Sequence, residues 1–319
     1  MSLINSGQRY GFYHREKEIF EIRCGVFATD CADCKVLNDS GHNRHSQSVR
    51  SRAHLFTHSK TVFLLLVIMT EKFRVSIVNY TNTLPFKWAL KRSDFLKSID
   101  LQEDIPSICA QKLKYKQVDI ALVPVALLPE LDQYHIETDY CIGANGKVDS
   151  VKLYSAVPLE QIKTVTLDYQ SKSSITLIKV LLKFFWKHPV TFLEAKPGFE
   201  NDIQDTNAAV IIGDRTFGLQ GKHAYEFDLA EEWKKFTGLP FVFAAWVSTE
   251  KLPADFIANF NAVLKEGMDH VAQAVEEDYN VKSLSKEDTV VYLTKRIDYK
   301  LDADKRKALN LFLDYIKQL

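Results

Sequence analysis

Short apolar runs of strand length alternate with helical segments along most of this 319-residue chain, and this alternation constrains the fold most. Early apolar runs cover residues 74–78 and 119–125, with helical spacing at 86–91 and 107–116, where Ser107 is the expected cap. Strands that alternate with helices form largely parallel sheets with helices on both faces. The sequence therefore predicts the α/β class.

The same pattern restarts near residue 160. Strand-like runs are expected at 163–167, 190–193 and 208–212. Two helices are also expected, one capped by Ser173 or Ser174 and one at 231–236. A strand pair is expected in residues 136–157, from the polar turns of 136–156 and the alternation in 148–157. The long apolar run 241–247 is followed only by expected helices at 253–278 and 303–318, which indicates that the chain returns to its first unit.

These patterns predict two α/β lobes with a ligand cleft between them. Lobe 1 is expected to be discontinuous and to comprise 69–157 and 241–319, and lobe 2 to comprise 158–240. This is the architecture of solute-binding proteins, which close around a ligand by a hinge motion.

The first 68 residues differ in composition from the remainder, since all nine Pro and all four Trp of the chain follow them. Cys31 and Cys34 have the spacing of half a zinc site, with Cys24 and two histidines nearby, but the interval from Cys34 to His42 is short for a zinc finger. No metal is predicted. We expect a poorly ordered leader, or upstream sequence read through in frame ahead of a natural start at Met69.

Charge and hydropathy exclude several classes of partner. The formal net charge is +0, so no global field recruits nucleic acid or a membrane surface. The longest uncharged apolar stretch, 62–69, is far shorter than the ~20 residues that span a bilayer, and no signal-peptide cleavage site follows it. Cys109 and Cys141 show no disulfide pattern, which favours the cytoplasm. The oligomeric state stays open.

A polar loop, residues 79–86, follows the first predicted strand. In open α/β sheets, ligands bind where loops leave the carboxyl ends of strands. Two later polar turns, 143–146 with Ser150 and 171–174, are expected to face this loop. Together they supply neutral hydrogen-bond donors, and the helix starts at Pro85 and Ser174 add free N–H groups. The donor side chains are Asn82, Ser150, Ser171, Ser173 and Ser174.

This arrangement predicts a site for a small anion. The alternative interpretation is that these residues only cap helices and form turns, which is the commonest use of a single serine at such a place.

Familiar catalytic motifs are absent from the sequence. It contains no Walker-type phosphate loop, GxGxxG, HExxH or GxSxG. The four histidines after residue 68 are isolated and are expected to be structural. Asp214 ends a predicted strand after Gly213, where it is either an active-site carboxylate or a turn residue.

Several segments, in order and spacing, match one family. They are Asn79–Pro85, Asp119–Val125, Cys141–Ser150, Asp168–Ser174, Ala209–Asp214 and Trp233–Ala244. From about Arg74 to the C-terminus the chain resembles chorismate dehydratases of the futalosine route to menaquinone. It departs from the family pattern at Lys147, where proline is common, and at 168–170, which is bulkier than expected.

The resemblance implies a periplasmic-binding-protein-like fold of type II and a carbon–oxygen lyase without a cofactor. Such an enzyme removes water from chorismate, a dianion, and gives 3-[(1-carboxyvinyl)oxy]benzoate. Two alternatives remain. One is 1,4-dihydroxy-6-naphthoate synthase of the same pathway, whose opening motif this chain lacks. The other is a non-catalytic small-anion-binding protein.

For individual residues, the resemblance implies that Asn82 orients the substrate. A substrate carboxylate is the expected proton acceptor, and Asp214 is its rival as the catalytic base. The residues expected to bind the substrate are Thr83, Ser150, Ser171, Ser173, Ser174 and Gly213.

Overall fold

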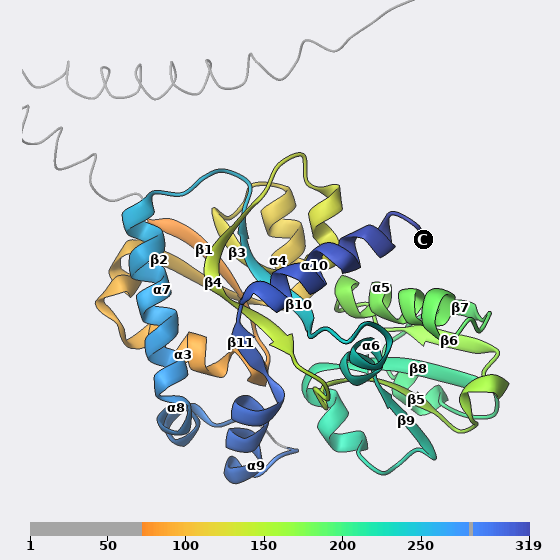
Figure 1. The fold of residues 1–319 in the computed structure, drawn as a ribbon. Coiled ribbons are helices and arrows are strands. Elements are labelled where there is room, and N and C mark those ends of the chain that lie inside the picture. The colour runs from red at the N-terminus through yellow and green to blue at the C-terminus, as the bar shows by residue number, and fades with distance from the viewer. Residues whose placement is uncertain (1–71, 281–282) are drawn as a thin grey trace, which may run out of the picture. The chain divides into compact units, whose positions relative to one another are not determined.

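Two β-sheets, each covered by helices, make up the part of the chain that the computed structural model describes, residues 72–280 and 283–319 (Figure 1). Residues Thr70–Leu319 form one unit. The cysteine and histidine cluster of the predicted leader lies outside the described residues.

The first sheet has six strands in the order β11-β4-β10-β3-β1-β2. Strands β1, β2 and β3 are mutually parallel neighbours, and β10 runs antiparallel to both β3 and β4. The strands are β1 Phe73–Val78, β2 Ile99–Asp104, β3 Ile120–Pro124, β4 His135–Ala144, β10 Phe241–Ser248 and β11 Asp298–Lys300.

The second sheet has five strands in the order β7-β6-β8-β5-β9. Strand β6 is parallel to β7 and β8, whereas β5 runs antiparallel to β8 and β9. The strands are β5 Val151–Ser155, β6 Thr164–Leu167, β7 Thr191–Glu194, β8 Asn207–Ile212 and β9 Tyr225–Asp228.

Helices α3 and α4 follow β1 and β2 and lie on opposite faces of the first sheet, because the chain moves outward to β2 and then back across β1 to β3. Helix α7 packs against α3, and α5 and α6 cover the second sheet (Figure 1). The helices are α3 Leu84–Arg92, α4 Pro106–Lys114, α5 Lys172–Val180, α6 Leu229–Thr237, α7 Ala254–Asp269, α8 Val271–Asp278, α9 Lys286–Val291 and α10 Ala303–Ile316.

The predicted α/β class, with two separate sheets, is confirmed, but several local predictions are wrong. Helix α4 begins at Pro106 after Ile105, not at a Ser107 cap, because proline is preset for the first helical turn. The helix expected at 253–278 is two helices, since the backbone leaves helical angles at His270.

The lobe boundary expected at residue 157 differs from the strand pairing. The segment 136–157 does hold two strands, β4 and β5, but they are not a pair: β5 pairs with β8 and β9 and so belongs to the second sheet. The chain therefore passes between the sheets in the segment 145–150, and it returns between α6 and β10 at Gly238–Pro240. Within the described residues, no helix combines the length and the apolar character that crossing a membrane requires.

Candidate functional site

A pocket lies where strands of both sheets end. The loop after β1, the end of β3 and strand β10 contribute from the first lobe. The start of β5, the start of α5 and the end of β8 contribute from the second lobe, and the crossing segment 145–150 contributes Val148 and Ser150. The lining residues are Val78, Tyr80, Asn82, Pro106, Pro124, Ile142, Val148, Ser150, Val151, Ser171, Ser174, Ile212, Gly213, Phe243 and Ala244. This is the strand-end position at which ligands of open α/β folds bind.

Asn82 lies in a short helical turn, Thr81–Thr83, between β1 and α3. Its backbone carbonyl accepts a hydrogen bond of 2.9 Å from the Tyr299 hydroxyl, which fixes the turn against β11. Its side-chain Oδ1 is buried and has no hydrogen-bond partner among the described residues. A buried oxygen without a partner is costly, so this atom is poised to accept a hydrogen bond from a bound molecule.

Ser150 is buried at the end of the first crossing between the lobes. The Tyr292 hydroxyl lies 2.8 Å from Ser150 Oγ and donates to it, which leaves the serine proton directed elsewhere. Burial raises the pKa of Tyr292, so the phenol stays protonated and keeps donating. Neither Tyr292 nor Tyr299 carries a local sequence signal for the site, because both contact Ser150 or Asn82 from the distant C-terminal segment.

Ser171 and Ser174 line the pocket at the start of α5, and their hydroxyl groups are 3.3 Å apart. Ser171 occupies the N-cap position, so the free N–H groups of the first helical turn lie beside these hydroxyl groups. Ser173 points elsewhere: its Oγ accepts from the Ala126 N–H at 3.1 Å and links α5 to the first lobe.

Thr83 and Asp214, two other predicted site residues, also lie outside the pocket lining. The Thr83 hydroxyl donates to the Val78 carbonyl at 2.5 Å and serves the loop itself. Gly213 lines the pocket, whereas the Asp214 carboxylate faces the Thr81 N–H, with both of its oxygens at 3.2 Å. Burial raises the pKa of Asp214.

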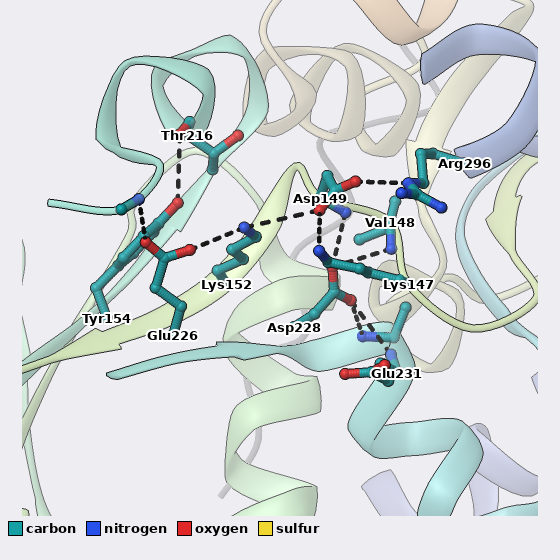
Figure 2. Close-up of polar contacts among 12 residues, drawn as sticks. Lys147, Val148, Asp149, Lys152, Tyr154, Thr216, Glu226, Asp228, Glu231 and Arg296 are labelled. Atoms are coloured by element: carbon teal, nitrogen blue, oxygen red, sulfur yellow. Dashed lines mark hydrogen bonds and ion pairs between the residues drawn. The ribbon is translucent and has the colours of Figure 1, made fainter. Parts of the chain in front are cut away.

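A polar network holds the first crossing between the lobes (Figure 2). The buried Asp228 carboxylate accepts from Val148 N at 3.0 Å and Asp149 N at 2.7 Å, and its other oxygen caps α6. Asp149, with φ +64°, bonds Arg296 Nε of the first lobe at 2.6 Å. Asp228 therefore fixes the backbone directly before Ser150.

The pocket offers neutral polar groups on apolar walls. Among the described residues that line it there is no Lys, Arg, His, Asp or Glu, and its one titratable side chain, Tyr80, has a pKa that burial raises. In the described ranges, 72–280 and 283–319, no group of three His, Cys, Asp or Glu side chains is placed to hold a metal ion. The arrangement suits a ligand with an apolar body and anionic groups that accept hydrogen bonds.

Comparison with known families assigns the chain. A family model described as menaquinone biosynthesis matches residues 73–318, which is nearly all of the described part. The chain belongs to this menaquinone-biosynthesis family. The predicted family resemblance is thereby confirmed.

Two relatives that are similar in sequence are both named chorismate dehydratase. A chorismate dehydratase of Campylobacter jejuni is 24% identical over 251 residues, which cover 76% of this chain and 96% of that protein. A chorismate dehydratase of Thermus thermophilus is 23% identical over 224 residues, which cover 64% of this chain and 80% of that protein.

Solved structures with the same fold extend beyond this family. Protein AF1704 from Archaeoglobus fulgidus has a TM-score of 0.64 at 13% identity and covers 77% of this chain and 97% of its own. The alkanesulfonate-binding protein SsuA from Xanthomonas axonopodis, solved with bound MOPS, has a TM-score of 0.55 at 15% identity and covers 77% and 92%. At these identities the likeness shows the fold alone.

Proposed function

We propose that this protein is a chorismate dehydratase, a carbon–oxygen lyase that converts chorismate and yields 3-[(1-carboxyvinyl)oxy]benzoate and water. The observation that carries the proposal is the pocket lining, in which neutral donors surround an apolar space. The family match and the two named relatives agree with it. The free, buried thiols of Cys109 and Cys141 fit a reducing compartment, so we place the reaction in the cytoplasm.

The substrate's chemistry suits this lining. Chorismate has an apolar cyclohexadiene ring and two carboxylates, and the pocket pairs apolar walls with Ser150, Ser171 and Ser174. The first turn of α5 adds backbone N–H groups and the positive end of a helix dipole, both of which favour an anion. We assign one carboxylate to this helix start and the other to the neighbourhood of Ser150.

The reaction breaks two bonds on neighbouring ring carbons. The carbon that bears the ether loses a proton, the electron pair of that C–H bond becomes a ring double bond, and the hydroxyl on the next carbon leaves and is protonated to water. The product ring is aromatic, so the step is downhill without an oxidant or reductant. Holding the groups in this geometry can supply roughly 7–11 kcal/mol in favourable cases.

The composition of the lining supports a substrate carboxylate as the proton acceptor. No carboxylate or imidazole lines the pocket among the described residues, so we assign the proton to a carboxylate of the substrate. Asn82 orients the substrate, with its unpartnered Oδ1 accepting a hydrogen bond from the substrate hydroxyl. Asp214 is not needed as a base in this scheme.

Incubation of the purified protein with chorismate tests the proposal. We expect loss of the cyclohexadiene absorbance together with formation of the enolpyruvyl ether of 3-hydroxybenzoate, identified by mass. The protein with Ser171 and Ser174 both changed to alanine should convert chorismate much more slowly and bind it more weakly, because two donors to a carboxylate are removed.

Calorimetric titration separates the alternatives. Binding of chorismate without turnover would replace the lyase by a small-anion-binding protein, a function that the fold shared with SsuA would accommodate. If chorismate is neither bound nor converted, the proposed substrate is wrong.

A further inference from the structure

Two contacts reach from the second lobe to the loop that carries Asn82. Both oxygens of the Asp214 carboxylate lie 3.2 Å from Thr81 N, which immediately precedes Asn82. One residue earlier, the Tyr80 hydroxyl donates to Gln170 Oε1. We call these two contacts the cross-lobe latch.

The cross-lobe latch contacts the turn Thr81–Thr83, which the first lobe also contacts. The Asn82 carbonyl receives the Tyr299 hydroxyl at 2.9 Å, so the first lobe fixes one side of the turn. The Thr81 N–H, on the other side, has the Asp214 carboxylate as its hydrogen-bond partner. The two lobes thus contact neighbouring peptide groups of the turn that carries Asn82.

The second-lobe half of the latch is itself rigidly placed. Asp168 Oδ1 accepts from Gln170 N at 3.0 Å, and its Oδ2 accepts from Ile212 N at 3.2 Å and pairs with Arg215. Gly213 adopts φ +68°, and a Cβ there would lie 3.0 Å from the Tyr80 ring. Because Gly213 packs closely against the Tyr80 ring, Asp214, the residue after Gly213, lies next to Thr81, the residue after Tyr80.

We propose that Asp214 is a positioning residue that sets Asn82 for catalysis by accepting the Thr81 N–H across the closed cleft. The proposal rests on the proposed dehydratase function for the meaning of Asn82. It assigns Asp214 a task outside proton transfer, in keeping with a carboxylate that does not line the pocket.

The hydrogen-bond chemistry separates a positioning role from a base. A backbone N–H needs only an acceptor, and the amide oxygen of asparagine supplies one, whereas alanine does not. A general base must take up a proton, which asparagine cannot do at all. The pair Asp214→Asn and Asp214→Ala therefore distinguishes the two roles.

We expect Asp214→Asn to keep kcat and KM for chorismate within about threefold of the wild type. Asp214→Ala should raise KM about tenfold, because a smaller share of the free protein holds Asn82 in place, while saturating substrate restores most of kcat. Equal loss of kcat in both variants would assign Asp214 to proton transfer. Wild-type kinetics in Asp214→Ala would remove it from the site altogether.

Removing the donor provides the matched test. Proline at position 81 deletes the N–H, and the extended backbone of Tyr80, φ −122° and ψ 167°, suits the residue before a proline. Thr81→Val keeps the N–H and loses only the hydroxyl, so it serves as the control. We expect Thr81→Pro to reproduce the KM increase, Thr81→Val to lack it, and Asp214→Ala to add nothing further in the Thr81→Pro background.

Hydrogen exchange of the full-length protein without substrate tests the latch separately from turnover. Asp214→Ala should speed amide exchange in the peptide 80–84 at least about tenfold, since Thr81 loses its acceptor, and Asp214→Asn should not. Unchanged exchange in Asp214→Ala would overturn the latch even if chorismate is turned over. If the wild type does not convert chorismate but Asp214→Ala still speeds exchange in the peptide 80–84, the latch is retained and the dehydratase function is rejected.

Discussion

At the scale of single residues, the site depends on one unpaired oxygen. Asn82 is held by its backbone, through the Tyr299 hydroxyl, and its Oδ1 is left buried without a partner among the described residues. Such an atom weakens the empty protein and is satisfied when a ligand donates to it. This unsatisfied oxygen supports our proposal that Asn82 accepts a hydrogen bond from a bound ligand.

We predict that Asn82→Ala lowers kcat for chorismate about 100-fold or more, the usual effect of losing a positioned polar group that acts in the transition state. Asn79→Ala is the control. Its Oδ1 accepts from Lys87 Nζ at 2.6 Å on an exposed part of the same loop, so the rate should change little. Steady-state kinetics with both variants decide the matter, and an unimpaired Asn82→Ala would take Asn82 out of the mechanism.

How far could the site be predicted from the sequence? Strand ends pointed to Asn82, Ser150, Ser171, Ser174 and Gly213, which all line the pocket, although their roles in binding stay predictions. A one-dimensional pattern could not tell which hydroxyl groups bond the backbone instead, as those of Thr83 and Ser173 do. It also could not bring the C-terminal tyrosines to the cleft, since that contact is made only by the tertiary fold.

At the scale of elements, the clearest constraint is the approach of α7 to α3. Gly267 lies in α7 where an added Cβ would be 2.2 Å from the Pro85 carbonyl oxygen, a backbone atom that cannot swing aside. Helix α3 begins directly after the turn that carries Asn82. Pushing α3 outward therefore disturbs both packing and the site.

We predict that Gly267→Ala lowers the free energy of unfolding by about 2 kcal/mol, because overpacking outweighs the better helix propensity of alanine. In Gly218→Ala the new Cβ would meet Ser283 Oγ at 3.7 Å, an ordinary contact, so stability should stay within about 0.5 kcal/mol. Urea denaturation of both variants measures the difference. Equal stability of the two would mean that α3 shifts freely on α7.

Asp228 connects three elements and titrates in an accessible range. Burial raises the pKa of Asp228 to about 6 from 3.8, with Asp149 adding repulsion, although backbone N–H groups pull it the other way. The native carboxyl therefore holds its proton more tightly than the unfolded chain does. Its contribution to stability is fully present below pH ~4 and is lost as the pH rises through about 6.

We predict that the stability of the wild type relative to Asp228→Asn falls by about 1.4 kcal/mol between pH 5 and pH 7, since only the wild type ionises there. Urea unfolding at the two pH values measures this difference of differences. A relative stability that rises with pH would mean that the four N–H contacts, not burial, control this carboxyl.

Element prediction succeeded where a strand is buried on both faces. The continuous apolar runs that became β1, β3, β8 and β10 are visible without any partner, as expected for central strands. Three of the four edge strands, β2, β9 and β11, were missed because their sequences are largely polar, whereas the edge strand β7 was predicted from its apolar residues. Their strand conformation depends on a neighbour that the local sequence does not reveal.

At the scale of the whole molecule, the two lobes meet through more than the two crossings. The Ala126 N–H bonds Ser173 Oγ, Lys172 pairs with Glu130, and the latch closes the mouth at Thr81. These contacts join the lobes beside the pocket. We expect a ligand to enter through an opening motion of the lobes, in which case release of the product depends on breaking these same contacts.

The order of strands in the first sheet also has a consequence during synthesis. Strand β10 lies between β4 and β3, yet the whole second sheet separates it from them along the chain. When residue 240 has just emerged from the ribosome, every strand of the second sheet is available. The first sheet then has β4 on one side and β3, β1 and β2 on the other side of the position that β10 will fill. We predict that chains stalled there resist protease across 151–228 before they do so across 73–144, and that protection of the earlier segment appears once β10 emerges. The lobe that the chain enters second is thus expected to be the one that folds first.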